Sequence, residues 1–149
     1  KSIEMNESLQ YIRQAIITRL TNSVTFNGSY VPIYNRLPSS SEEPYVKVYS
    51  LAHREIDQNA TSFTSLCETR IEVFTAFDAD DGGEYQSNSI TDQIINLIRT
   101  RSAGYYDLSS HNFSVYTCEI ESIKYSEKEE NDKTYFKSLI TISNRIQKI

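Results

Sequence analysis

The chain has 149 residues, of which 38% are hydrophobic and 23% charged, and its 11 Tyr and 6 Phe favour folding over intrinsic disorder. A chain of this length fits one ordinary domain, so we predict a single domain over residues 1–149. The formal net charge of −5, with no basic run longer than two residues, argues against a general nucleic-acid binder and against a membrane-surface protein.

The sequence predicts a soluble protein. No apolar run approaches the ~20 residues that a helix needs to cross a bilayer, and no basic-then-apolar signal segment opens the sequence. Two cysteines, Cys67 and Cys118, lack CxxC spacing and are expected to be buried thiols on strands. A single disulfide between them would require that the two strands are neighbours.

The first element is an N-terminal helix over residues 3–21, which Asn22 and Ser23 end. Apolar residues at steps of three and four place one face toward a core, namely Met5, Leu9, Ile12, Ile16 and Leu20. Charged residues are expected to point away from that face, namely Glu4, Glu7, Arg13 and Arg19.

Residues 28–34 predict a short extended segment, which Pro32 confines to a sheet edge because proline cannot donate to a ladder. Residues 37–44, with two Pro and three Ser, predict an irregular surface loop.

Two strands are predicted over residues 45–56 and 65–77, which are rich in Val, Tyr, Thr, Ile and Phe. Their polar connection, residues 57–62, lacks a tight-turn Gly and predicts a long, mobile hairpin arm. Strict alternation in the second strand assigns one set of side chains to the core, namely Cys67, Thr69, Ile71, Val73, Thr75 and Phe77.

A second helix is predicted after the acidic loop, with Ser87 or Ser89 as its N-cap and Gly104 at its end. Its shared face comprises Ile90, Ile94, Leu97, Ile98 and Arg101.

The last third predicts two long strands over residues 112–124 and 134–146, joined by a charged tip over residues 125–133. Their buried side is assigned to Cys118, Ile120, Phe136, Ile140, Ile142 and Ile146. The order of elements predicts an α+β fold, with a mostly antiparallel sheet, two helices packed on one face and two long β-hairpins.

No catalytic, cofactor or metal site emerges from the motifs, so we predict that the chain is not an enzyme. Residues 78–84 place carboxylates before glycine, but a calcium loop would need ligands where Gly82 and Ser89 stand. His53 and His111 lack ligand-spaced neighbours and are expected at the surface. Nucleophile-elbow, P-loop and dinucleotide motifs are absent.

The arrangement resembles the tail terminator or tail-completion proteins of tailed bacteriophages. The resemblance covers nearly the whole chain and lies in the order of its parts, from the end of the first helix to the final strand pair. Its most telling part is the sequence Val31-Pro32-Ile33-Tyr34 followed by Pro44-Tyr45-Val46, ahead of the strand at residues 68–75 and the helix at residues 90–97.

The resemblance implies a structural protein of the virion tail or neck, assembled in the host cytoplasm as a homo-oligomeric ring, expected to be a hexamer. It implies contacts with the tail tube protein and with the head–tail connector or stopper protein, and a lumen through which DNA passes without specific binding. Acidic residues facing the lumen would suit the net charge of −5.

Long hairpins offer unpaired edges and protruding arms that invite pairing with neighbouring subunits. We therefore predict contact arms at residues 54–63 and 126–133 and an edge contact at residues 30–34. The candidate interface residues are Tyr30, Pro32, Tyr34, Arg54, Glu55, Asp57, Phe63, Glu127, Lys128, Glu129, Glu130 and Lys133.

Three alternatives remain open. The chain could be another neck or connector ring protein, a small ligand-binding domain or enzyme with an unrecognised site, or a cellular adaptor of the same fold class. Residues 78–84 are the only local support for a ligand-binding domain or enzyme.

Overall fold

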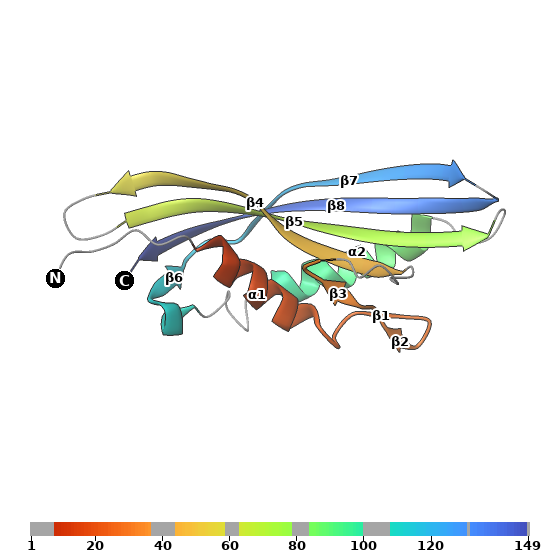
Figure 1. Cartoon of the computed structure of the whole chain (residues 1–149), viewed down its shortest axis with the longest axis horizontal. Coiled ribbons are helices and arrows are strands. Elements are labelled where there is room, and N and C mark those ends of the chain that lie inside the picture. The colour runs from red at the N-terminus through yellow and green to blue at the C-terminus, as the bar shows by residue number, and fades with distance from the viewer. Residues whose placement is uncertain are drawn as a thin grey trace.

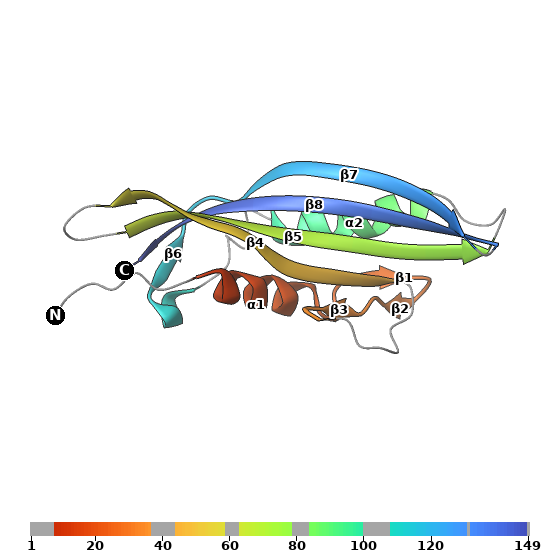
Figure 2. The same cartoon turned by 45° about the horizontal axis from the view of Figure 1, so that its top comes forward.

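Two helices pack on the same face of one long, curved β-sheet in a computed structural model of the chain (Figure 1). The structure describes residues 8–36, 44–58, 63–78, 84–99, 108–130 and 132–148. The strands bend along their length, as a second view shows (Figure 2). In chain order the elements are α1 (Leu9–Leu20), β1 (Thr25–Phe26), β2 (Ser29–Tyr30), β3 (Ile33–Tyr34), β4 (Tyr45–Gln58), β5 (Phe63–Asp78), α2 (Glu84–Ile98), the 3-10 turn η1 (Ser109–His111), β6 (Phe113–Val115), β7 (Glu119–Glu130) and β8 (Lys133–Lys148).

The predicted α+β class is confirmed, with two long hairpins, β4–β5 and β7–β8, joined along β5 and β8. The main sheet has the order β3-β4-β5-β8-β6, and β7 also pairs with β8. Every pair in it is antiparallel except β3 with β4. As Pro32 predicts, β3 lies at the edge of this sheet.

The helices form because each has one apolar stripe that the sheet covers. The stripe of α1 buries Ile12, Ile16 and Leu20, and that of α2 buries Ile90, Ile94 and Ile98. They meet the alternate residues of β5 that were assigned to the core, of which Cys67, Thr69, Ile71, Val73 and Thr75 are buried and Phe77 is half-buried. Removing each such Ile side chain from water contributes about 1.5–3 kcal/mol.

The two arginines of α1 do not point away from the protein, contrary to the sequence prediction. Arg13 Nη1 donates to Ser50 Oγ at 3.0 Å, and Arg19 Nη1 donates to the carbonyl oxygen of Leu97 at 3.5 Å. Both side chains lie on the flanks of the helix, where a long stem can cover apolar neighbours while its head reaches a polar partner. The predicted helical residues 3–7 lie outside the described part of the chain.

The predicted N-cap of the second helix is wrong. The helix begins at Glu84, so Ser87 is internal and fully buried, and its carbonyl oxygen accepts a hydrogen bond from Thr91 Oγ1 at 2.8 Å. The helix ends at Ile98, ahead of the predicted stop at Gly104, which lies outside the described residues together with Arg101.

The predicted strand over residues 112–124 is two strands. β6 pairs with the end of β8 near Ile146, whereas β7 begins opposite Ser143. Between them, Asn144 Nδ2 donates to the carbonyl oxygen of Thr117 at 2.9 Å, and Thr117 Oγ1 accepts from the backbone nitrogen of Arg145 at 2.8 Å. These side-chain bonds replace the ladder locally and break the strand.

Both predicted hairpin connections are shorter than expected. Strand β4 ends at Gln58, and strand β5 begins at Phe63. Residues 59–62 of that arm lie outside the described residues, as do residues 37–43 of the predicted loop. The charged segment 125–133 is almost entirely strand, because Glu130 is the register partner of Lys133. Asp132 takes a left-handed φ of 62°, which tightens the turn.

Both cysteines are buried thiols, as predicted, but Cys67 alone lies on a strand as expected. Cys67 lies on β5 and Cys118 just before β7, and β8 runs between these two strands. The condition for a disulfide, that their strands are neighbours, is therefore not met. The Ser8 hydroxyl lies 3.3 Å from Cys67 Sγ.

Candidate interaction surface

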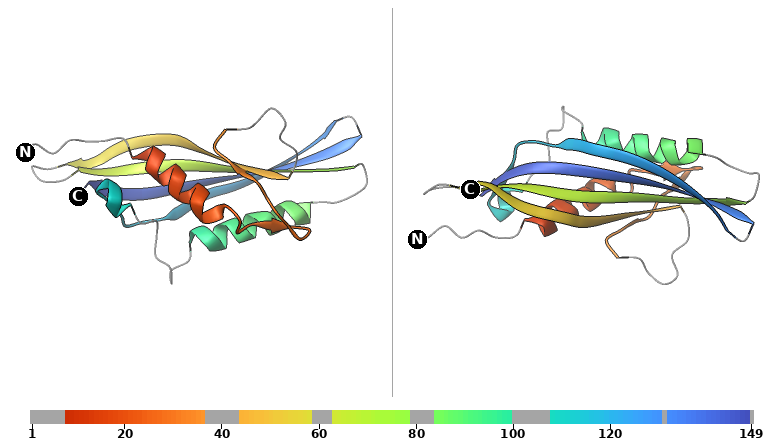
Figure 3. Two further views of the ribbon diagram at one scale, coloured as in Figure 1. Left: turned by 60° about the horizontal axis from the view of Figure 1, so that its bottom comes forward. Right: turned by 90° about the horizontal axis from the view of Figure 1, so that it is seen from above.

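One face of the sheet is left uncovered by the described elements, because both helices lie on the other (Figure 3). We call it the open face. Its side chains come from the alternate residues of each strand that point away from the helices, such as the even-numbered residues of β5 from Leu66 to Ala76, which are all half-buried.

Cross-strand register gathers basic residues on this face. Residues that are register partners across the strands form a row. Lys47 and Lys124 lie in the row of Glu72, and Arg70 lies in the row of Tyr49. Lys137 lies in the row of Phe74, and Lys128 lies in the row of Ala76. We define the basic band as Lys47, Arg70, Lys124, Lys128 and Lys137.

The basic band has defined limits. Glu72 is the one acidic position within its four rows among the described residues. The next row on one side contains Glu68 and Glu119, and the next row on the other side contains Asp78 and Glu130 with Lys133 between them. The band is therefore a short positive patch on a chain whose net charge is −5.

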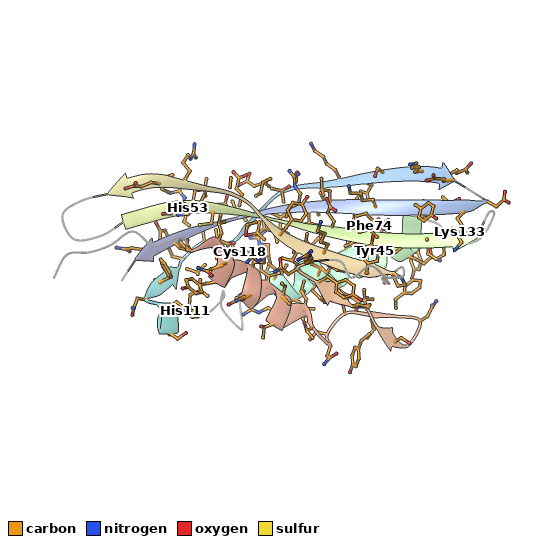
Figure 4. All side chains as sticks on the ribbon, in the orientation of Figure 1. Tyr45, His53, Phe74, His111, Cys118 and Lys133 are labelled. Atoms are coloured by element: carbon orange, nitrogen blue, oxygen red, sulfur yellow. The ribbon has the colours of Figure 1, made fainter. Side chains whose placement is uncertain are left out.

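Aromatic rings lie among the basic residues at the centre of the band. The rings of Tyr45 and Phe74, both labelled in Figure 4, stack with their centroids 4.8 Å apart. Lys137 Nζ lies 5.5 Å above the Phe74 ring, and Lys47 Nζ lies 5.3 Å above the Tyr49 ring. Such cation–π contacts orient an ammonium group without neutralising it.

Glu72 connects two of these residues. Its Oε1 accepts a hydrogen bond from the Tyr49 hydroxyl at 2.7 Å and lies 3.5 Å from Lys137 Nζ. Burial, together with the hydrogen bond to Glu72, raises the pKa of Tyr49, although Arg70 acts in the opposite direction. Tyr49 is therefore a neutral donor at neutral pH.

The pleat of β7 places the basic and acidic side chains near the end of the hairpin on different faces of the sheet. Lys124 and Lys128 of β7 lie on the open face, whereas Glu127 and Glu129 lie on the opposite face, beside the exposed Tyr125. We call Tyr125, Glu127 and Glu129 the acidic rim. Lys128 Nζ also lies 3.3 Å from Glu130 Oε2, in an exposed pair.

The structure places the predicted contact arms at opposite ends of the sheet. Arg54 and Glu55 are exposed on β4 toward the Gln58 end, and the backbone there also carries Asp57 and Phe63. The exposed residues Glu127, Lys128, Glu129, Glu130 and Lys133 lie at the far end of β7–β8 (Figure 1). The two sets do not meet within one chain.

The predicted edge contact divides between two sheets. Tyr30 is 63% exposed on the separate β1–β2 ribbon. Pro32 is exposed, and its carbonyl oxygen accepts from the backbone nitrogen of Val46 at 2.9 Å, which docks β3 onto β4. Tyr34 is half-buried, with its ring 6.2 Å from that of Tyr45.

Both long edges of the sheet are unpaired over most of their length among the described strands. Strand β3 covers β4 only at Val46 and Lys47, and β7 has β8 on one side alone. Exposed strand edges of this kind can accept a further strand from another chain. The outer end of the β7 edge, residues 127–130, is charged throughout, which disfavours indiscriminate pairing.

The histidines do not form a site. His111 is exposed, as predicted, with its ring stacked 3.9 Å from Tyr11, whereas His53 is half-buried. In the described ranges no cluster of His, Cys, Asp or Glu is arranged to hold a metal ion, and no helix there could span a membrane. The acidic segment 79–83 lies outside those ranges.

Sequence reasoning missed the basic band because its members are scattered from Lys47 to Lys137. Each member occupies an outward position of a strand, so the signal was present in the alternation. Finding it required the register between strands, which no single segment contains.

Comparison with the profiles of known protein families finds no match to this chain, and comparison with curated proteins finds none either. The function of this chain is therefore inferred from its own surfaces: the basic band, the open strand edges and the two hairpin ends.

Proposed function

We propose that this chain is a structural virion protein, a tail terminator or tail-completion protein whose ring caps the phage tail tube and joins it to the head connector. The observation that carries the proposal is the placement of two unlike hairpin ends at opposite ends of one sheet with open edges. The order of helices and strands that resembles this family adds to it.

Unlike ends favour head-to-tail assembly. A contact between one end of a subunit and a different surface of the next is heterologous, and repeating it around an axis closes a ring. A hexamer is the form that the resemblance implies. On this proposal the ring belongs to the virion tail or neck, is assembled in the host cytoplasm, and lets DNA pass through its lumen without specific binding.

The open edges support the same reading. Strand addition to an exposed edge supplies main-chain hydrogen bonds between subunits, and charged side chains along the edge select the partner. Another neck or connector ring would use the same geometry, and its partner would distinguish it from a terminator.

Light scattering coupled to size-exclusion chromatography tests the proposal on the purified chain, with and without tail tube protein. We expect one discrete closed oligomer, visible as rings with a central hole by negative-stain electron microscopy. We also expect the rings to sit at the ends of tail tubes. A strict monomer at all concentrations, both alone and with tail tube protein, would contradict ring formation. Rings that ignore tail tubes and bind the head connector would indicate another neck protein.

A further inference from the structure

Charge is segregated between the two faces of the β7–β8 hairpin and the sheet it continues. Four rows of the open face contain five basic residues and Glu72, as defined above, although the whole chain carries −5. The other face of the same hairpin carries the acidic rim. Opposite faces of one element are therefore complementary in charge.

The band keeps cations available for an external partner. Lys137 is paired with Glu72, and Lys128 with Glu130. Lys47 and Lys124 have no acidic side chain within 4.0 Å in the described part of the chain. A partner that brings a carboxylate to Lys47 or Lys124 would gain attraction without breaking an existing ion pair.

The surface beside the band fits the edge of a hairpin. A groove of about 300 Å³ lies on the open face, lined by three aromatic residues, two lysines, one serine and one acidic residue, namely Phe74, Tyr135, Phe136, Lys128, Lys137, Ser126 and Glu130. The aromatic side chains and the two lysines of this groove suit a partner that presents an aromatic ring next to carboxylates. The acidic rim has this composition, because Tyr125 is 43% exposed beside Glu127 and Glu129.

The spacing of the carboxylates on the acidic rim also matches the spacing of the rows on the open face. Two residues on one face of a strand are about 7 Å apart, so Glu127 and Glu129 present carboxylates at that repeat. Adjacent rows of the open face, such as those of Lys47 and Lys137, recur along the strands at the same interval of about 7 Å. A rim laid parallel to the strands crosses one row for each carboxylate, and the three neighbouring rows of Glu72, Phe74 and Ala76 each contain a lysine.

We infer that the basic band of one copy of this chain receives the acidic rim of the next copy, in a contact that repeats head to tail. The inference rests on the proposed ring and specifies the surfaces that close it. Because the two surfaces lie on opposite faces, the contact is heterologous and cannot be satisfied by a two-fold dimer. The acidic rows at Glu68, Glu119 and Glu130 flank the band and would repel a longer polyanion such as duplex DNA.

Charge-swap complementation tests the pairing. One variant carries K47E and K124E in the band, and the other carries E127K and E129K in the rim. Each variant alone places like charges across the contact, and we expect its assembly to weaken by roughly tenfold or more. Mixed in equal amounts, the two variants pair band to rim in both directions, so we expect even-numbered rings to return, read out by light scattering. Recovery in the mixture also shows that both variants are folded.

Matched controls reverse charges elsewhere on the surface. Arg99→Glu and Asp92→Lys alter exposed residues at the end and on the outer side of α2. Both should assemble as the unmodified chain does.

The outcomes separate the inference from the proposed function. Normal assembly by both swapped variants would overturn the band–rim contact and leave the ring standing. Loss of assembly without recovery in the mixture would also overturn it. A strict monomer for the unmodified chain, even with tail tube protein, would remove the ring itself. Tight binding of labelled duplex DNA that K47E/K124E abolishes, with assembly unchanged, would assign the band to DNA instead.

Discussion

At the scale of single residues, Tyr49 is a partly buried phenol that contacts the charged Glu72 on the open face. Its hydroxyl donates to Glu72 at 2.7 Å, and burial is the largest cause of its raised pKa. A phenol keeps a raised pKa only while the fold holds it in that environment. The pH dependence of stability therefore reports on this contact.

We predict that Tyr49→Phe flattens the alkaline limb of the stability curve. In the unmodified chain the contribution of Tyr49 is fully present below the unfolded pKa of about 10. It is lost as pH rises through the higher folded pKa, because the folded state then binds more protons than the unfolded state. Urea unfolding from pH 7 to pH 11 measures the effect. An equally steep alkaline loss in Tyr49→Phe and the unmodified chain would contradict it.

The buried hydroxyls of Thr91 and Ser138 lie 2.8 Å apart, and Thr91 Oγ1 also donates to the Ser87 carbonyl oxygen. We predict that Thr91→Val costs about 1–3 kcal/mol, since it leaves the fully buried Ser138 hydroxyl without this partner. Ser138→Ala should cost less, about 0.5–1.5 kcal/mol, because Thr91 keeps its bond to Ser87. Chemical denaturation of both single variants and the double variant gives the coupling energy. A double variant whose loss equals the sum would exclude the coupling.

At the scale of elements, α1 is held by its buried stripe, because an isolated helix of its 12 residues is marginal in water. We predict that Ile16→Ala lowers the free energy of unfolding by about 2–5 kcal/mol through lost burial and a residual cavity. The matched control on the same helix is Thr18→Ala, which alters an exposed residue and should change stability by less than about 0.5 kcal/mol. Equal losses in the two variants would show that the stripe does not anchor the helix.

The far end of β7–β8 provides a second element-scale test. In the structure, β8 has β5 on one side and β7 on the other from Lys133 to Ser143, so its amides lie within ladders. We predict slow hydrogen exchange for residues 134–138, measured by mass spectrometry or NMR. Fast exchange across residues 126–138 would contradict this pairing and would extend the solvated tip beyond the residues 125–133 that the sequence predicts. Residues 45–50 of β4 serve as an internal reference with one fully paired side.

At the scale of the whole molecule, two electrostatic effects act on assembly with opposite signs. Copies that each carry −5 repel one another at long range, and salt screens that repulsion. A contact between the basic band and the acidic rim is attractive, and salt weakens it.

We predict that the local attraction dominates, so raising salt from about 0.05 M to about 0.5 M, where the Debye length falls well below 10 Å, shifts the oligomer toward smaller species. Analytical ultracentrifugation at several salt concentrations measures the shift. Assembly that strengthens with salt would indicate that apolar burial holds the ring and that net repulsion is the larger electrostatic effect.

The two helical stripes and the alternation of β5 from Cys67 to Thr75 could be predicted from the sequence alone. These follow from local periodicity, which the backbone geometry of a helix or strand imposes on neighbouring residues. The α+β class and the edge position of the segment after Pro32 follow in the same way, because the order of elements and the missing amide are local facts.

The ends of the strands and the clustering of charged residues depend on contacts between segments that are distant in the chain. Residues 125–130 look like a solvated run, yet β8 offers them ladder partners, and pairing extends a strand beyond its apolar content. Thr117 breaks the preceding strand through a contact with Asn144, far away in the chain. The basic band unites Lys47 with Lys137 across three strands. Its existence depends on cross-strand register, which is set by the packing of the whole sheet and not by any one segment.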